Sequence, residues 1–211
     1  MFTEILDNLV VFEGGDGSGT STQIGLLGER LAKGDPGTPP FFPTAEPTDG
    51  AVGRLIRLAL KNSPALHPGT LARLFAADRN EHLFAPDGIA ERCRRGELVA
   101  CDRYVLSSLA YQGIECGEDL PRGLNSCFPA PRLLLFFDLD PRAAQERMRG
   151  RASLDIFENI DFQQKVRERY LSLLAECRAA GVAVETIDAS QSPEKVADDV
   201  WRAVSKMPIM G

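Results

Sequence analysis

Four glycines fall within the six residues Gly14–Gly19, which follow the apolar run Leu9–Phe12 and precede a helical pattern. Such a turn lets consecutive backbone N–H groups surround phosphate oxygens, and the following helix N-terminus adds partial positive charge. The first and last of these glycines, with Ser21, match the pattern GxxxxGK[ST], in which the hydroxyl binds Mg²⁺, but Thr20 replaces the lysine. The segment therefore predicts a nucleotide phosphate site that lacks one cation. The alternative is a glycine-rich turn that binds no ligand.

Phe75 and Arg79 stand four residues apart in the run LFAADR, so a helix places both on one face. An aromatic ring beside a guanidinium can stack on a flat base and donate hydrogen bonds to its edge. Taken alone, however, the pair favours a core phenylalanine next to a solvated arginine.

Asp102 and Arg103 follow the apolar run Leu98–Cys101, at the end of a predicted strand where open parallel sheets bind their ligands. The carboxylate can hold hydrated Mg²⁺, and the guanidinium can clamp a phosphate with two hydrogen bonds. The predicted helix that follows carries polar side chains at Ser107, Ser108, Tyr111 and Gln112. The alternative is an Asp–Arg pair that only caps this helix.

Three arginines, Arg147, Arg149 and Arg151, surround Gly150. Such a group could close over phosphates as a lid. On a helix Arg147 and Arg151 share a face and Arg149 does not, so the three cannot all point inward. A solvated helix end is an equal alternative for any one of them.

Short apolar runs alternate with longer helical patterns along the chain. Strands are expected at Leu9–Phe12, Pro40–Phe42, Leu98–Cys101, Leu133–Phe137 and Val182–Ile187. Helices are expected at Thr20–Ala32, Ala51–Lys61, Leu71–His82, Asp87–Arg94, Leu106–Gln112, Arg142–Arg149, Phe162–Ala179 and Pro193–Ser205. Clusters of proline and glycine at Gly34–Pro47, Pro64–Gly69 and Gly117–Gly123 indicate loops. The pattern predicts one α/β domain over residues 1–211, with a parallel sheet of five strands covered by helices on both faces.

The composition narrows the class of protein. Twenty-four basic against 30 acidic residues give a net charge of -6 over 211 residues, which argues against a general nucleic-acid binder. No apolar run reaches the ~18–20 residues of a membrane span, and the N-terminus lacks the basic start of a signal peptide. Five cysteines without a CxxC pair indicate reduced thiols rather than a disulfide framework or a zinc site. We therefore expect a soluble cytoplasmic protein, in which His67 and His82 are structural residues without an evident partner.

Taken together and in this order, the motifs resemble those of the thymidylate kinase family. FEGGDGSG is similar to the family's phosphate loop, EPTDGAVGRLIR to the entrance of its second helix and LFAADR to its base-binding helix. DRYVLSSLAYQ and RMRGRASLDIFE resemble its DRY segment and its lid, so the resemblance covers nearly the whole chain. It implies a P-loop NTPase-type fold with a small lid at about residues 147–158, and a homodimer. The implied reaction is transfer of the γ-phosphoryl group of ATP to dTMP with Mg²⁺, giving dTDP and ADP.

The resemblance also assigns roles to residues at the donor site. The phosphates of ATP would be bound by Gly14, Gly15, Asp16, Gly17, Ser18, Gly19, Thr20, Ser21 and Thr22. Ser21 and Asp102 would serve Mg²⁺, directly or through water. Arg149 and Arg151 would be the catalytic arginines of the lid, because the phosphate loop contains no arginine, and Asp16 and Arg103 would complete the catalytic set.

At the acceptor, Phe75 would stack on thymine and Arg79 would donate to its O4 edge. Asp16 would hold the 3′-hydroxyl, Arg103 would bind the phosphate, and Tyr111 would crowd the 2′ position of the sugar. Ser107 and Gln112 would complete the dTMP site.

Two departures from the family remove positive charge. Thr20 replaces the loop lysine, and Ala45 stands where the family usually has an arginine that contacts the acceptor phosphate. Either the lid arginines or Arg54 compensate, or catalysis is slow. The alternatives to an active kinase are therefore a nucleotide-binding relative that acts as a sensor or partner protein, and a kinase for another nucleoside monophosphate.

Overall fold

The computed structural model of the chain describes residues 2–34, 37–61, 64–148 and 160–211. The strands are β1 (Ile5–Gly14), β2 (Phe41–Ala45), β3 (Leu98–Asp102), β4 (Ala130–Asp138) and β5 (Ala183–Asp188). The helices are α1 (Thr20–Ala32), α2 (Ala51–Leu60), α3 (Pro68–Phe84), α4 (Ile89–Arg94), α5 (Val105–Cys116), α6 (Asp119–Asn125), α7 (Pro141–Met148), α8 (Ile160–Ala179) and α9 (Pro193–Val204), followed by a 3₁₀ turn, η1 (Pro208–Met210). The strands form one parallel sheet in the order β2-β3-β1-β4-β5, which confirms the predicted fold class.

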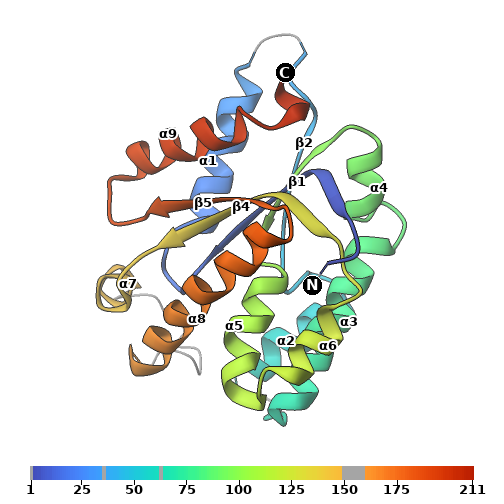
Figure 1. The fold of residues 1–211 in the computed structure, drawn as a ribbon, viewed down its shortest axis with the longest axis vertical. Helices are drawn as coiled ribbons and strands as arrows, with labels where there is room; N and C mark the ends of the chain where they lie inside the picture. The colour runs from blue at the N-terminus through green and yellow to red at the C-terminus, as the bar shows by residue number, and fades with distance from the viewer. Residues whose placement is uncertain (1, 35–36, 62–63, 149–159) are drawn as a thin grey trace.

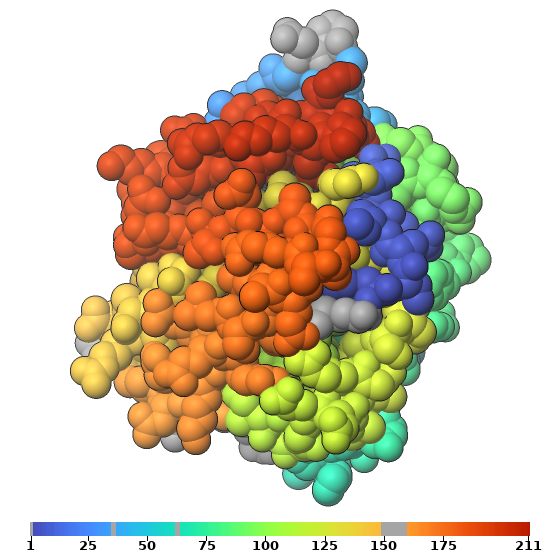
Figure 2. Space-filling view, viewed as in Figure 1, coloured from blue at the N-terminus to red at the C-terminus, as the bar shows by residue number. Residues whose placement is uncertain are grey.

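Helices cover both faces of this sheet (Figure 1). On one face, α1 and α9 pack through Leu27 and Val200 on Phe12 of β1. On the other face, α3, α4, α5 and α8 enclose a second core that contains Val11 and Tyr170. Figure 2 shows α8 and α9 covering one side of the molecule. Because both faces are buried, the strands are nearly continuous apolar runs, as the sequence pattern indicates.

Two predicted loops are partly helical. The range Gly117–Gly123 was expected to be a loop, but α6 occupies residues 119–125. Its proline stands in the first turn, where the missing N–H costs no helical hydrogen bond. The range Pro64–Gly69 likewise includes the start of α3, where the imidazole Nδ1 of His67 accepts a hydrogen bond from the N–H of Gly69 at 3.1 Å. The expectation that His67 has no partner is therefore wrong.

Strand register brings the chemically important loops together. Asp102 at the end of β3 is level with Phe12 of β1 and with Ala45 at the end of β2. The strands are parallel, so the segments that follow them leave the sheet at the same edge. The phosphate loop, the β2–α2 connection and the start of α5 therefore meet there.

Glu13 ties this edge together from inside the protein. Its carboxylate is fully buried and accepts hydrogen bonds from the N–H groups of Tyr104 and Ser107 at 2.9 and 3.2 Å. The hydroxyls of Ser107 and Tyr170 donate to its other oxygen at 2.6 and 3.0 Å. The carboxylate thus links β1 to the N-terminus of α5 and to α8. Burial raises the pKa of Glu13, although the hydrogen bonds from Ser107 and Tyr170 act in the opposite direction.

This raised pKa predicts a particular dependence of stability on pH. Above the ordinary glutamate value of 4.5, the native carboxyl keeps its proton longer than the unfolded one, so deprotonation disfavours folding. We expect the free energy of unfolding of the wild type, relative to Glu13→Gln, to fall as the pH rises from 4.5 toward neutrality. Urea unfolding followed by circular dichroism at several pH values measures this difference in the free energy of unfolding. A difference that grows with pH would contradict the raised pKa of Glu13.

Candidate active site

A cavity of about 400 Å³ opens between the phosphate loop, the β2–α2 connection, α3 and α5. We call it the main cavity. Its wall contains all the residues predicted for the acceptor, namely Asp16, Phe75, Arg79, Arg103, Ser107, Tyr111 and Gln112. Ser21 and Asp102 line it as well. The fold thus brings residues from the phosphate loop to α5 into one wall.

The phosphate loop has the backbone conformation that its glycines permit. Gly17 and Gly19 adopt φ angles of +79° and +94°, in the left-handed region that other residues avoid. Gly19 caps the N-terminus of α1, so the helix dipole faces the loop. Thr20, at the lysine position, is buried with 9% of its surface exposed. The positive potential of this loop therefore comes from backbone N–H groups and not from its own side chains.

Arg103 connects the phosphate loop with the start of α5. Its guanidinium donates to Oδ1 of Asp16 at 2.6 Å and to the carbonyl oxygen of Gly14 at 3.1 Å, and it lies 5.4 Å from the ring centre of Tyr111. The φ angle of Arg103 is +67°, which costs a non-glycine residue on the order of 1–3 kcal/mol. A hydrogen bond from its N–H to the carbonyl oxygen of Phe12 (2.9 Å) holds the backbone in this conformation.

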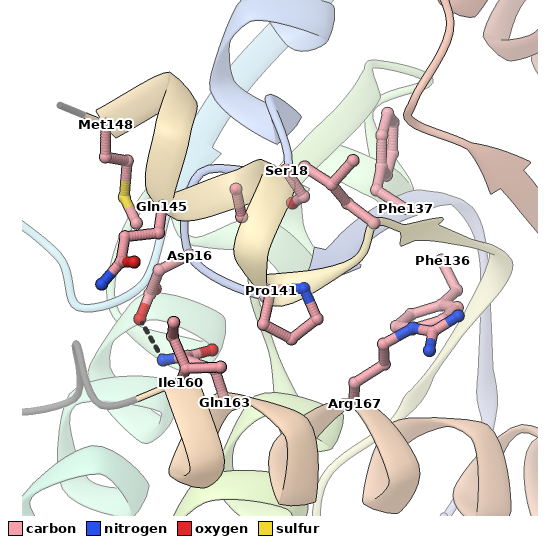
Figure 3. A pocket seen from close by; sticks show the side chains of 13 residues that line it. Asp16, Ser18, Phe136, Phe137, Pro141, Gln145, Met148, Ile160, Gln163 and Arg167 are labelled. Atoms are coloured by element: carbon pink, nitrogen blue, oxygen red, sulfur yellow. Dashed lines mark hydrogen bonds between the residues drawn. The ribbon is translucent and has the colours of Figure 1, made fainter.

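The second oxygen of Asp16 is engaged by α8. Nε2 of Gln163 donates to it at 2.8 Å, as Figure 3 shows. Behind this contact lies a cavity of about 20 Å³, closed on another side by Arg167, which pairs with Asp138 through bonds of 2.6 and 3.0 Å. That volume holds about one water molecule. Sequence reasoning missed Gln163, because its position in α8 carries no local signal for a contact with the phosphate loop.

Ser21 and Asp102 have the chemistry of a magnesium site. The Ser21 hydroxyl donates to Oδ2 of Asp102, and Oδ1 of Asp102 is buried without a hydrogen-bond partner among the described residues. A hydroxyl and a carboxylate are oxygen ligands of the kind that Mg²⁺ prefers. The residues present therefore fit this ion.

Arg79, in the wall of the main cavity, is buried with 1% of its surface exposed. Its Nη2 pairs with Oε2 of Glu46 at 2.6 Å, and its Nη1 donates to Ser108 at 3.2 Å and to Asn125. A solvated Arg79, the sequence-based alternative, is therefore wrong. Nε of Arg79 and Oε1 of Gln112 are both buried and have no hydrogen-bond partner in the described ranges.

His82 holds the other oxygen of Glu46. Its Nδ1 lies 3.2 Å from Oε1 of Glu46, and its Nε2 lies 2.6 Å from Oγ1 of Thr44. The expectation that His82 lacks a partner is wrong as well, because the partners come from β2 and the residue after it, distant in sequence.

Positive charge near Ala45 comes from Arg57 rather than from Arg54. Arg57 lines the main cavity together with Ala45, and its Nη2 donates to the carbonyl oxygen of Pro47. Arg54 donates to the carbonyl oxygen of Asp49 at 2.6 Å and is not in the cavity wall. Arg57 and Lys61 stand four residues apart and so share a helix face, but only the structure places that face in the cavity wall.

The predicted lid falls largely outside the described residues, and so do Arg149 and Arg151. Arg147 at the end of α7 is described, and its guanidinium donates to the carbonyl oxygens of Ala189 and Ser190 at 2.8 and 3.3 Å. It therefore contacts the β5–α9 connection and does not line the main cavity.

Comparisons with known proteins agree on one family. A family model for thymidylate kinase matches residues 12–200. A relative in Treponema pallidum, named as a thymidylate kinase, is 39% identical over 186 residues, which are 87% of this chain and 87% of that protein. A relative in Pyrobaculum aerophilum, also named as a thymidylate kinase, is 39% identical over 199 residues, covering 94% of this chain and 96% of that protein.

The fold agrees as well. The structure of thymidylate kinase from Candida albicans superposes with a TM-score of 0.80 at 22% identity, covering 97% of this chain and 93% of that one. No helix in the described ranges is long and apolar enough to cross a membrane. With the family model and both relatives spanning most of its length, this chain belongs to the thymidylate kinase family.

Proposed function

We propose that this protein transfers the γ-phosphoryl group of ATP to dTMP, giving dTDP and ADP. The observation that supports this proposal is the main cavity, whose wall combines an aromatic ring, arginines, hydroxyls and a carboxylate beside the phosphate loop. A cavity of about 400 Å³ is in the size range of small-ligand sites.

The base would lie between Phe75 and the polar end of the cavity. Arg79 and Gln112 line the cavity, and the Nε donor of the first and the Oε1 acceptor of the second have no hydrogen-bond partner within the described part of the chain. A thymine edge carries a carbonyl oxygen beside an N–H, which complements this pair. Cytosine presents an amino group where thymine has O4, so it would leave the arginine donor unpaired at a substantial cost.

The sugar and phosphate would lie toward the phosphate loop. Asp16 would accept the 3′-hydroxyl, and Tyr111 would occupy the space that a 2′-hydroxyl needs. Arg103 and Arg57 would neutralise the acceptor phosphate from two sides of the cavity. Ser107, whose hydroxyl faces both Glu13 and Arg103, would help keep Arg103 in place.

The reaction requires the two nucleotides to be aligned and the charge on their phosphates to be neutralised, and it does not require a general base. The acceptor is already an anionic phosphate, so no proton has to be removed before attack. When bound, Mg²⁺ would supply positive charge to the transferring phosphates, and Ser21 and Asp102 would hold it. Backbone N–H groups from Gly14 to Thr22 would bind the donor phosphates.

The absence of lysine at Thr20 leaves part of this charge to other groups. We propose that Arg149 and Arg151 supply it from the lid. A catalytically weak or inactive nucleotide-binding relative is the second candidate, and Thr20 is the observation that favours it. Ala45 favours it less, because Arg57 stands in the same cavity wall.

The wider organisation follows from the same proposal. We propose that the chain works as one domain with a lid at about residues 147–158, in the cytoplasm and as a homodimer. Leu55 and Leu58 on α2 support the homodimer, because 38% and 52% of their surfaces are exposed on one helical face.

An assay of ADP release with dTMP, ATP and Mg²⁺ tests the reaction on the wild type and Thr20→Lys together. We expect wild-type turnover of about 1–100 s⁻¹, the usual range for kinases, because other groups supply the missing charge. We expect Thr20→Lys to change it by less than about tenfold, since the lysine would add to charge already present. Wild-type turnover at the no-enzyme level, restored by Thr20→Lys, would instead favour the inactive relative.

Arg57 and Arg54 form a matched pair on α2 for testing the acceptor phosphate site. Arg57→Ala should raise the KM for dTMP by roughly 10–100-fold, the effect of losing one charge-assisted hydrogen bond. Arg54→Ala removes the same charge outside the cavity and should leave KM within about twofold. Steady-state kinetics at saturating ATP gives both values. Equal effects of the two substitutions would show that Arg57 acts only through the net charge of the surface.

A further inference from the structure

Arg79 is a cation buried inside the protein, which is costly unless partners surround it. The partners come from three elements that are distant in sequence: Glu46 after β2, Ser108 on α5 and Asn125 on α6. They occupy Nη1 and Nη2 of the guanidinium and leave Nε as its buried donor without a partner in the described ranges. These partners set the orientation of the Arg79 guanidinium, a side chain that lines the main cavity.

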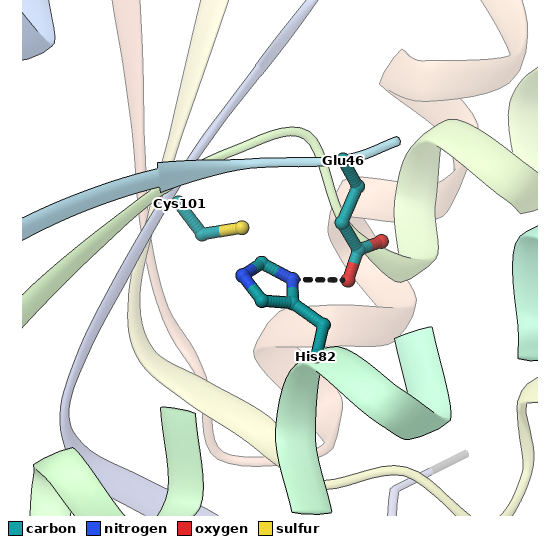
Figure 4. Close-up of side chains that lie close together, drawn as sticks. All are labelled: Glu46, His82 and Cys101. Atoms are coloured by element: carbon teal, nitrogen blue, oxygen red, sulfur yellow. Dashed lines mark hydrogen bonds and ion pairs between the residues drawn. The ribbon is translucent and has the colours of Figure 1, made fainter. Parts of the chain in front are cut away.

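Glu46 is itself held in place by His82, which contacts Thr44 in turn. Glu46 is 5% exposed, and Arg79 donates to one of its oxygens at 2.6 Å. Nδ1 of His82 lies 3.2 Å from the other oxygen (Figure 4). The opposite nitrogen of His82 meets Thr44 of β2 at 2.6 Å. The imidazole thus links β2 to the carboxylate of Glu46 and holds this carboxylate in position. The carboxylate in turn holds the guanidinium of Arg79.

Figure 4 also shows the thiol of Cys101 near this imidazole, and the ligand atoms of Glu46, His82 and Cys101 lie within 4.8 Å of one another. This spacing would suit a metal ion, but the bonding favours a hydrogen-bonded network. Glu46 already neutralises Arg79, the thiol donates to the carbonyl oxygen of Arg103 at 3.1 Å, and burial raises the pKa of Cys101 well above its usual value.

Asn125, another partner of Arg79, is also held by a hydrogen bond of its own. It is 2% exposed, and its Nδ2 donates to the carbonyl oxygen of Pro121 at 2.8 Å within α6. That bond turns the amide so that its oxygen faces Arg79, because the two ends of an amide have opposite hydrogen-bonding character. The proposed phosphoryl transfer does not use the side chains of Glu46, His82 or Asn125.

We propose that Glu46, Asn125 and, through Glu46, His82 are positioning residues that orient Arg79 and thereby set the preference of the main cavity for its base. This proposal rests on the proposed function, because it assumes that the main cavity receives a nucleoside monophosphate. It extends that function by assigning base selection to residues outside the expected dTMP contacts. Loss of a positioning residue should weaken binding of dTMP and its preference over dCMP, and leave the transfer step intact.

The test compares His82→Ala with His67→Ala, which removes a histidine from the start of the same helix, far from Arg79 in sequence. His82→Ala should raise the KM for dTMP by about tenfold and reduce the preference for dTMP over dCMP, with kcat within about threefold. His67→Ala should change none of these values by more than about twofold. His82→Gln, which keeps a donor toward Glu46, should recover part of the loss.

Asn125 provides a second, independent comparison. Asn125→Ala removes the oxygen that accepts from Arg79 and should raise the KM for dTMP by about tenfold or more. Asn125→Asp keeps an oxygen toward Arg79 but loses the donor to the Pro121 carbonyl, so it should recover only part of the loss. If Asn125→Ala fails to fold, as judged by its circular dichroism, Asn125→Asp and the histidine pair still decide the question.

Calorimetric titration of dTMP separates this proposal from the one on which it rests. If the wild type binds no dTMP, the proposed function fails. If the wild type binds dTMP and His82→Ala and Asn125→Ala bind it equally tightly, with unchanged preference over dCMP, the positioning role is overturned while the proposed function stands. A fall in kcat without any change in KM or base preference would also overturn it.

Discussion

The guanidinium of Arg103 and the buried carboxylate of Glu13 hold the same two segments of the chain, one from each side. Arg103 reaches back to Asp16 and to the carbonyl of Gly14, while Glu13 reaches forward to the first N–H groups of α5. These contacts fix the phosphate loop against the start of α5 and keep Arg103 at a positive φ that it would otherwise avoid. Each depends on the pairing of β1 with β3, since a slip of one residue would reverse the side chains.

The arginines of the main cavity differ in their exposure to water and in how their charge is balanced. At the end proposed for the phosphate, the side chains of Arg103 and Arg57 are 24% and 45% exposed, so an anion can reach them. At the end proposed for the base, Arg79 is buried away from water and Glu46 balances its charge inside the protein. A buried ion pair is costly to assemble but is rigid, and rigidity suits the recognition of a planar edge by a few fixed donors and acceptors. The division matches the chemistry of a nucleotide, which is anionic at one end and neutral at the other.

The parallel sheet could be predicted from the sequence, because strands buried on both faces leave continuous apolar runs. The glycine-rich phosphate loop between a strand and a helix supported the same fold. Sequence reasoning missed α6, because proline and glycine hid a short helix whose stability comes from packing on α3 and α5. It also missed Asn125 and Gln163. Both act on residues far away in the chain, Arg79 and Asp16, and no local periodicity marks such a contact. The choice of Arg57 over Arg54 required the helix to be placed against the cavity.

The central claim is that the main cavity binds the acceptor nucleotide beside the phosphate loop. A crystal structure of the protein with dTMP and a non-hydrolysable ATP analogue tests it most directly. The account predicts thymine against Phe75 and Arg79, the dTMP phosphate at Arg103, and the donor phosphates along Gly14–Thr22. A structure in which dTMP lies elsewhere, with the main cavity free of nucleotide while the analogue occupies the phosphate loop, would contradict it.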